Sequence, residues 1–211
     1  MVSSRHVSPT QVLLYVPNLI GYARVGLLVA SLFFALGQPV VFLALYAASF
    51  LLDAADGHAA RLLDQTSKFG AVLDMATDRV ATNALVLTLS HLYREYIVWF
   101  QLLCILDLGS HWLRMYASLL DGAASHKHAS PERDGHLVTL YYTNRLVLGG
   151  VCLLNEFFYI GLYALFHFSG SPAARLLVLV TAPVFAFKQY LSIMQLLNSC
   201  RAIVEHDAHD K

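Results

Sequence analysis

Charged residues are scarce in this sequence, and their scarcity excludes several classes of protein. Asp, Glu, Lys and Arg make up 13% of the 211 residues, about half the share in ordinary soluble domains, whereas 57% of the residues are hydrophobic. Lys plus Arg number 14 and Asp plus Glu number 14, so there is no basic excess to attract nucleic acid. We therefore expect an integral membrane protein, surrounded by lipid, with no nucleic-acid partner.

Cysteine is also sparse, which argues against a disulfide scaffold and a zinc site. Cys104, Cys152 and Cys200 are far apart, lie in or beside apolar runs and form no CxxC pair, so we expect small buried hydrophobic residues. The opening stretch, MVSSRHVSPTQ, lacks the basic start, apolar core and small-residue cleavage site of a secretory leader. No removable signal peptide is expected.

Long apolar runs are abundant. A helix needs roughly 20 apolar residues to cross a hydrocarbon core of about 30 Å. The sequence predicts six such spans, at residues 20–36, 40–62, 70–92, 97–120, 146–168 and 176–197. The one long polar stretch, 121–135, is expected to be a loop, and there is no internal repeat. The expected fold class is all-α, a polytopic integral membrane protein with a single domain over residues 1–211.

The loop charges predict how the chain lies in the membrane. With six spans, both termini lie on the same side as the even-numbered loops. Seven basic residues fall on that side: Arg5, Arg61, Lys68, Lys127, Arg133, Arg201 and Lys211. Only Arg94 and Arg175 fall on the other. Because basic loops stay in the cytosol, the termini are predicted to be cytosolic.

Four aspartates lie within two successive apolar spans. Asp53 and Asp56 are three residues apart and Asp74 and Asp78 are four apart, so each pair shares one face of a helix. Both pairs fall at the same ends of antiparallel neighbours, where four carboxylates repel one another unless something positive neutralises them. Carboxylate oxygens suit Mg²⁺ or Mn²⁺, and these ions favour phosphoryl chemistry.

Small residues and an arginine accompany the first pair. Gly57 and Ala60 fall on the stripe of Asp53, where short side chains let a ligand approach the backbone. Arg61, at the edge of the stripe, can hold a phosphate through two parallel hydrogen bonds. Proton relays and metal transporters also use carboxylates inside membranes, so the spacing alone leaves these two functions open.

The stretch DAADGHAAR (53–61), followed by Gly70, Asp74 and Asp78, resembles the signature D-x2-D-G-x2-A-R-x8-G-x3-D-x3-D of the CDP-alcohol phosphotransferase family. Every fixed position of that signature is filled. Within the family, the chain is most similar to the eukaryotic phosphatidylinositol synthases. Segments that carry this likeness include VPNLIGYAR (16–24), FGAVLDMATDR (69–79), YYTNR (141–145) and NEFFY (155–159), so the resemblance spans almost the whole chain.

The resemblance implies a reaction and its setting. The phosphatidyl group of CDP-diacylglycerol would pass to myo-inositol with release of CMP. The resemblance also implies six transmembrane helices, two bound divalent ions (Mg²⁺ or Mn²⁺) and a homodimer. The expected location is the endoplasmic reticulum membrane, with the active site facing the cytosol.

Residue roles follow at the matching positions. The implied metal ligands are Asp53, Asp56, Asp74 and Asp78. Asp78 is also the implied catalytic base, which takes the proton from the acceptor hydroxyl. The implied contacts to the CDP group of the lipid substrate are Gly57, Arg61 and Ser67.

The residues that hold the acceptor are less sharply indicated. Asp107, His111 and Arg114 form a polar stripe on the predicted span 97–120, and either line an acceptor pocket or make an internal ion pair between helices. Lys127 and Arg145 flank the polar loop and bind either the acceptor or lipid headgroups. Lys127, Arg145 and His111 are therefore the candidate acceptor-binding residues.

Three other activities remain alternatives at this level. Another CDP-alcohol phosphotransferase would use glycerol phosphate, serine, choline or ethanolamine as acceptor, and the four-aspartate motif does not exclude it. A membrane prenyltransferase also uses paired aspartates and Mg²⁺, although its motifs usually lie on more distant helices of a longer chain. A divalent-cation transporter would use the same carboxylates without needing Gly57, Ala60 and Arg61 beside them.

Overall fold

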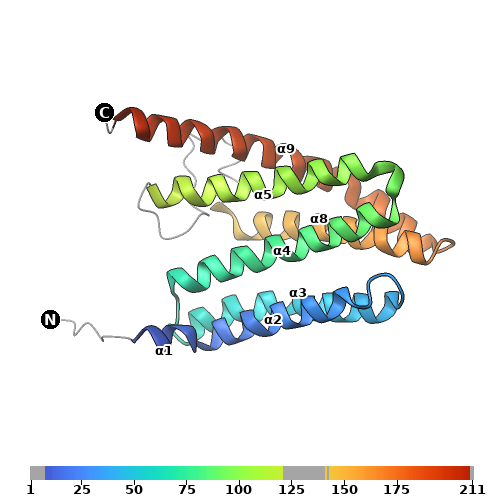
Figure 1. Cartoon of the computed structure of the whole chain (residues 1–211), viewed down its shortest axis with the longest axis horizontal. Helices are drawn as coiled ribbons and strands as arrows, with labels where there is room; N and C mark the ends of the chain where they lie inside the picture. The colour runs from blue at the N-terminus through green and yellow to red at the C-terminus, as the bar shows by residue number, and fades with distance from the viewer. Residues whose placement is uncertain (1–7, 121–140, 142, 210–211) are drawn as a thin grey trace. The chain divides into compact units, whose positions relative to one another are not determined.

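In the computed structural model, which describes residues 8–120, 141 and 143–209, the regular elements of the described part are helices (Figure 1). They are α1 (Pro9–Leu13), α2 (Val16–Leu32), α3 (Pro39–Leu62), α4 (Lys68–Leu92), the short 3₁₀ helix η1 (Arg94–Tyr96), α5 (Ile97–Leu120), α8 (Arg145–His167) and α9 (Pro172–His209). The chain divides into two compact units, Met1–Ala81 and Thr82–Lys211, and α4 continues from the first into the second.

In the first unit, α2 and α3 pack side by side as an antiparallel pair (Figure 1). The preceding α1 begins with a capping box in which Ser8 and Gln11 bind each other's backbone amides, an arrangement that satisfies two N–H groups at the helix start. Pro39 is in the first turn of α3, where a missing N–H costs nothing. Leu28 of α2 and Phe42 of α3 are almost completely buried, so the apolar part of the pair is closely packed.

A short turn between α3 and α4 brings the two aspartate-bearing helices together. Asp64 has a left-handed backbone (φ 51°), a conformation that Asp tolerates better than most side chains. The Gln65 Oε1 atom accepts a hydrogen bond from the backbone N–H of Val16 at 2.9 Å, which ties the turn to the start of α2. The Ser67 Oγ atom accepts one from the Gly70 amide at 2.9 Å and so caps the first turn of α4.

In the second unit, α9 packs against both α5 and α8. The side chain of Asn144 caps α8 by accepting hydrogen bonds from the amides of Leu146 and Val147. Phe158 of α8 stacks on Phe185 of α9 with their ring centroids 4.2 Å apart. These contacts are local to the second unit and hold its long helices together.

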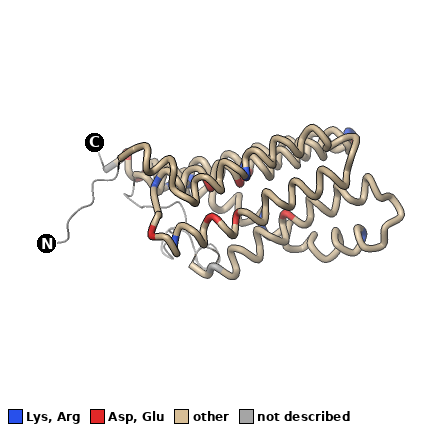
Figure 2. Tube along the Cα trace, turned by 90° about the horizontal axis from the view of Figure 1, so that it is seen from below, with Lys and Arg blue, Asp and Glu red and all other residues tan. Residues whose placement is uncertain are grey.

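The surface composition suits a lipid environment. Four helical segments within the described residues are long and apolar enough to cross a membrane: Pro39–Leu62, Arg94–Leu120, Leu146–His167 and Pro172–Ala208, with Val16–Leu32 as a shorter apolar helix. Large apolar side chains such as Leu51, Trp99 and Leu179 remain more than two-thirds exposed. Charged residues are sparse along the trace (Figure 2). The chain is therefore an integral membrane protein, and the count of six spans stays a prediction.

The observed helices differ from the predicted spans mainly at their ends. The prediction 97–120 coincides with α5, whereas α2 begins and ends four residues before the predicted 20–36. The last helix continues to His209 instead of ending near residue 197. The expectation of buried cysteines is wrong for Cys200, which is exposed, while Cys104 and Cys152 are partly buried.

Candidate functional site: one arginine among four aspartates

The four aspartates of the motif converge on the guanidinium of Arg24, which comes from α2. Its Nη1 atom lies 2.6 Å from Asp56 Oδ2 and 3.3 Å from Asp74 Oδ1. Its Nη2 atom lies 2.7 Å from Asp53 Oδ1 and 2.6 Å from Asp78 Oδ1. The predicted pairing of two carboxylates from each of two helices is thus present, with an arginine from a third helix between them.

Burial makes these ion pairs important for stability. The Arg24 side chain is 3% exposed, and a charge taken so far out of water needs partners. Removing one partner from a buried pair typically costs about 3–5 kcal/mol. The Ser49 Oγ atom also donates a hydrogen bond to the backbone oxygen of Arg24 at 2.9 Å, which ties α2 to α3 beside the cluster.

The carboxylates are less enclosed than the arginine between them. Asp53, Asp74 and Asp78 keep 37%, 30% and 35% of their side-chain surface exposed, whereas Asp56 keeps only 10%. The cluster therefore has an inner side, where the guanidinium lies, and an accessible outer side. Arg79 also acts on Asp78, but four carboxylates still outnumber the two guanidinium groups, so the cluster attracts further cations.

The donor set fits a hard divalent metal ion. Asp53, Asp56 and Asp74 each offer a carboxylate oxygen, and these three atoms all lie within 4.8 Å of one another. Oxygen ligands of this type are those that Mg²⁺ and Mn²⁺ prefer. Asp78 is outside this close group and joins the site through its contact with Arg24.

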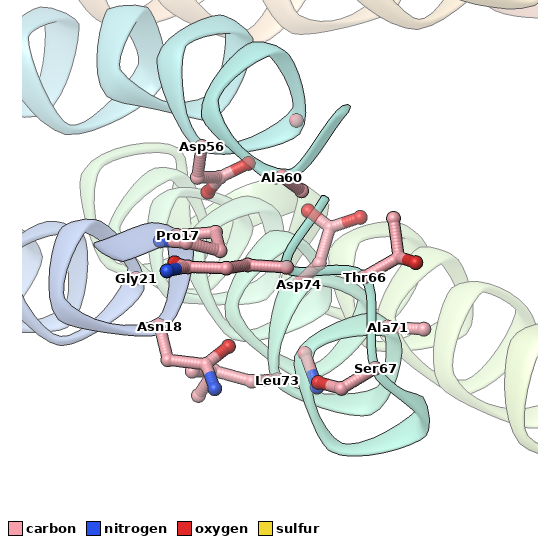
Figure 3. A pocket seen from close by; sticks show the side chains of 13 residues that line it. Pro17, Asn18, Gly21, Asp56, Ala60, Thr66, Ser67, Ala71, Leu73 and Asp74 are labelled. Carbon is pink, nitrogen blue, oxygen red and sulfur yellow. The ribbon is translucent and has the colours of Figure 1, made fainter. Parts of the chain in front are cut away.

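A cavity of about 170 Å³ opens beside the cluster, within the first unit (Figure 3). Asp56 and Ala60 of α3 and Asp74 of α4 line one part of it (Figure 3). Its other lining residues come from α2, the α3–α4 turn and the adjoining parts of α3 and α4: Pro17, Asn18, Gly21, Gly57, Gln65, Thr66, Ser67, Gly70, Ala71 and Leu73. The cavity thus combines carboxylates with hydroxyl, amide and backbone groups able to bind a polar ligand.

Two of the three predicted substrate-contact residues line this cavity, and the third lies next to one of them. Gly57 and Ser67 line it, and Arg61 is exposed with its Nη1 atom 3.5 Å from the point where a Cβ on Gly57 would stand. The space over Gly57 is therefore bordered by a guanidinium that can meet a phosphate. Gly70 has a packing role in addition, because a Cβ there would come within 2.9 Å of Asn18 Oδ1.

The candidate acceptor residues belong to the other unit or to undescribed parts of the chain. His111 is buried in α5, with its Nδ1 atom 2.8 Å from the backbone oxygen of Asp107. Asp107 in turn accepts a hydrogen bond from the Nδ2 group of Asn83 at 2.8 Å, so this stripe makes internal contacts between helices. Arg145 begins α8, but its side chain is outside the described part, as is the whole of Lys127.

Sequence reasoning gave Arg24 no role, although a signal was present. Arg24 is the one charged residue of α2, an otherwise apolar helix. A lone charge in such a segment normally faces a partner inside the protein. The four aspartates were expected to need a positive partner, so the two observations together point to Arg24.

Comparison with known proteins agrees with the motif. The sequence model of the CDP-alcohol phosphatidyltransferase family matches residues 14–201. The CDP-diacylglycerol–inositol 3-phosphatidyltransferase of Candida albicans is 43% identical over 208 residues, which cover 99% of this chain and 90% of that protein. The proteins of the same name from Saccharomyces cerevisiae and Homo sapiens are each 41% identical, and cover 96% and 95% of this chain and 91% and 96% of their own lengths.

No solved structure matches the chain. The family match nevertheless includes all four aspartates, Arg24 and most of both compact units. The relatives align over nearly the whole length of both partners, so the likeness is not confined to the short motif. The chain belongs to the CDP-alcohol phosphatidyltransferase family.

Proposed function

We propose that this protein is a phosphatidylinositol synthase, which transfers the phosphatidyl group of CDP-diacylglycerol to myo-inositol and releases CMP. The observation that carries the proposal is the convergence of Asp53, Asp56, Asp74 and Asp78 on one point beside a cavity that Asp56 and Asp74 help to line. The names of the relatives support inositol as the acceptor, because proteins with that name align over nearly the full chain.

The four aspartates are proposed to hold two divalent ions, Mg²⁺ or Mn²⁺. When bound, such ions neutralise the charge of a pyrophosphate and stabilise CMP as the leaving group. The exposed sides of Asp53, Asp74 and Asp78 support this proposal, since these carboxylates keep surface available beyond their contact with Arg24.

The cavity is proposed to receive the CDP part of the lipid substrate. Gly57 leaves room for a ligand close to the α3 backbone, and Arg61 borders that room with a guanidinium suited to a phosphate. The hydroxyl group of Ser67 is already an acceptor for the Gly70 amide, and its proton remains for a ligand. The diacylglycerol tails would then extend along the apolar surface of the helices.

Asp78 is proposed as the general base. A hydroxyl oxygen of inositol forms a bond to the lipid-side phosphorus, the bond from that phosphorus to the CMP oxygen breaks, and the hydroxyl proton passes to Asp78. Base assistance of this kind is typically worth about 10²–10⁴ in rate. The 35% exposure of the Asp78 side chain supports the role, because the acceptor must reach the base.

The acceptor site itself is proposed more broadly. Lys127, Arg145 and His111 remain the candidates for contacts to inositol. Of these, His111 already has partners inside its own unit, which favours a packing role for it. We also propose that each chain forms a single domain and that two chains form a homodimer. The dimer is proposed to lie in the endoplasmic reticulum membrane, with its active sites and termini in the cytosol.

An acceptor panel tests the proposed activity. Purified protein in detergent is supplied with CDP-diacylglycerol and Mg²⁺ or Mn²⁺, and CMP release is measured with myo-inositol, glycerol phosphate, serine, choline or ethanolamine. Release that depends on inositol and yields phosphatidylinositol is expected. Release driven by another acceptor would reassign the protein within its family, and ion flux without CMP would favour a transporter.

A further inference from the structure

We infer that Arg24 is an internal counter-cation that occupies carboxylate oxygens needed by the metal ions and gives up contacts with them when the ions bind. The inference deepens the proposed function, because it rests on a metal site at the same aspartates. It concerns a residue outside the aspartate motif, and it predicts two arrangements of one side chain.

The contacts of Arg24 are those of a cation that holds a cluster together. Each terminal nitrogen bridges one aspartate of α3 and one of α4: Nη1 joins Asp56 to Asp74, and Nη2 joins Asp53 to Asp78. A divalent ion between the two helices would make the same kind of bridge. The guanidinium therefore connects carboxylates of α3 and α4 that metal ions would also connect.

Charge explains why the arrangement changes with metal. The four carboxylates outnumber the two guanidinium groups that act on them, Arg24 among all four and Arg79 beside Asp78, and so attract cations. Two divalent ions carry four positive charges, which match the four carboxylates without help from the arginine. The guanidinium then becomes surplus, and it is repelled by ions bound to the oxygens that it contacts.

The surroundings of Arg24 restrict the change to its side chain. The backbone oxygen of Arg24 is held by Ser49, so α2 stays in place. The Nε atom is buried and has no hydrogen-bond partner among the described residues, so the guanidinium does not use all its donors in its present position. A released guanidinium keeps its full charge, and two of the carboxylates that it contacts, Asp56 and Asp74, line the cavity proposed for the CDP group.

The alternative is a static arginine. In that case the ions use only the outer oxygens of the carboxylates, and Arg24 keeps all four contacts throughout. A static arginine and a displaced one differ in one measurable respect. Removing a charge beside the carboxylates strengthens metal binding even when the arginine stays in place. Arg24→Lys keeps the charge but has a single nitrogen, so it binds metal more tightly than wild type only if the wild-type guanidinium has to give up contacts.

The experiment compares Mn²⁺ binding by wild-type protein, Arg24→Gln and Arg24→Lys, without substrate, in detergent. Arg24→Lys against wild type is the matched comparison, because it leaves the net charge unchanged. Arg61→Gln measures the smaller effect of losing an exposed positive charge from a residue that has no ion pair with the four aspartates among the described contacts. Calorimetry or the electron paramagnetic resonance signal of free Mn²⁺ gives affinity and stoichiometry. Melting temperatures are recorded with EDTA and with Mn²⁺.

Arg24→Gln is expected to bind Mn²⁺ about tenfold more tightly than Arg61→Gln, which corresponds to about 1.4 kcal/mol. In EDTA, Arg24→Gln is also expected to melt at a lower temperature than wild type. Its melting temperature should rise more than that of wild type when Mn²⁺ is added, because metal then supplies the missing bridge between the helices. Arg24→Lys keeps the charge on a single nitrogen, so its affinity for Mn²⁺ should fall between those of wild type and Arg24→Gln. If Arg24→Gln does not fold without metal, the Arg24→Lys comparison decides.

The outcomes separate the inference from the function on which it rests. Wild-type protein that binds no Mn²⁺ refutes the metal site, and the inference with it. Wild-type protein that binds Mn²⁺, with Arg24→Lys matching the wild-type affinity, leaves the metal site intact and refutes displacement. Weaker Mn²⁺ binding by both Arg24 variants also refutes it, because the arginine would then assist the ions.

Discussion

Gln65, in the turn between α3 and α4, accepts a hydrogen bond from the backbone N–H of Val16, the first residue of α2, across 2.9 Å. The contact links α2, which carries Arg24, to the turn between α3 and α4, which carry the four aspartates. It therefore joins the three helices that supply the site. Gln65 also lines the cavity. One amide side chain thus links the stability of the helix ends to the shape of the proposed substrate site.

Replacing Gln65 by Leu should therefore affect both stability and substrate binding. Loss of one hydrogen bond costs about 0.5–1.5 kcal/mol, or roughly 1–6 °C in melting temperature for a chain of this size. The KM for CDP-diacylglycerol should rise as well. Gln65→Glu is the control for stability, because a carboxylate oxygen still accepts from Val16 and suits a helix N-terminus. A Leu variant with wild-type melting temperature and KM would show that the contact is unimportant.

Asp78→Asn should separate chemistry from binding. An amide accepts no proton at neutral pH but still has an oxygen for the Arg24 guanidinium, so kcat should fall about 10²–10⁴-fold while CDP-diacylglycerol binding is largely retained. Asp53 belongs to the close group of three carboxylates and Asp78 does not, so Asp53→Asn should weaken metal and nucleotide binding as well. Turnover assays paired with equilibrium CDP binding measure the difference. Wild-type kcat in Asp78→Asn would refute the base assignment.

Gly70→Ala should destabilise the first unit. A Cβ at this position would stand 2.9 Å from Asn18 Oδ1 and 3.1 Å from Ser67 Oγ, so the contact between α2 and α4 has to open. Overpacking of this kind typically costs about 1–3 kcal/mol. Gly26→Ala in α2 is the matched control, because among the described residues no atom beyond its own stretch of helix lies within 4 Å of its Cβ position, and alanine favours a helix. The melting temperature of Gly70→Ala should be well below that of Gly26→Ala.

Chelation should abolish the reaction reversibly. With EDTA in excess, the four carboxylates retain Arg24 but lose the ions proposed to neutralise the pyrophosphate, so CMP release should stop. Added Mg²⁺ or Mn²⁺ should restore it, and inositol alone should not. Undiminished CMP release in EDTA would mean that the aspartates serve another purpose.

Much of the site could be predicted from the sequence because its residues lie close together along the chain. The pairs Asp53/Asp56 and Asp74/Asp78 follow from helical spacing, and their meeting follows from a short connection between two adjacent helices. Arg24 could not be placed by spacing, because it lies 29 residues before the first aspartate and depends on how α2 packs. Partner choice over such a separation is decided by tertiary structure.

Helix ends were predicted less well than helix centres, for a related reason. Hydropathy detects where a helix enters lipid, and it detected residues 97–120 of α5 in full. The polar end of α9, NSCRAIVEHDAH, has no Gly or Pro to end a helix, so the helix continues where the hydropathy signal stops. At the other end of the chain, α2 includes Pro17 in its first turn, which marks its start better than hydropathy does.

The burial of Arg24 also bears on how the protein is made. Because synthesis runs from the N-terminus, this arginine leaves the ribosome before any of its four carboxylate partners exists. An arginine at the centre of a lone helix disfavours translocon-mediated insertion by about 2.5–3.5 kcal/mol. Helix α2 therefore gains a stable place in the bilayer only after α3 and α4 have followed it, and biogenesis of the first unit is a joint event of three helices.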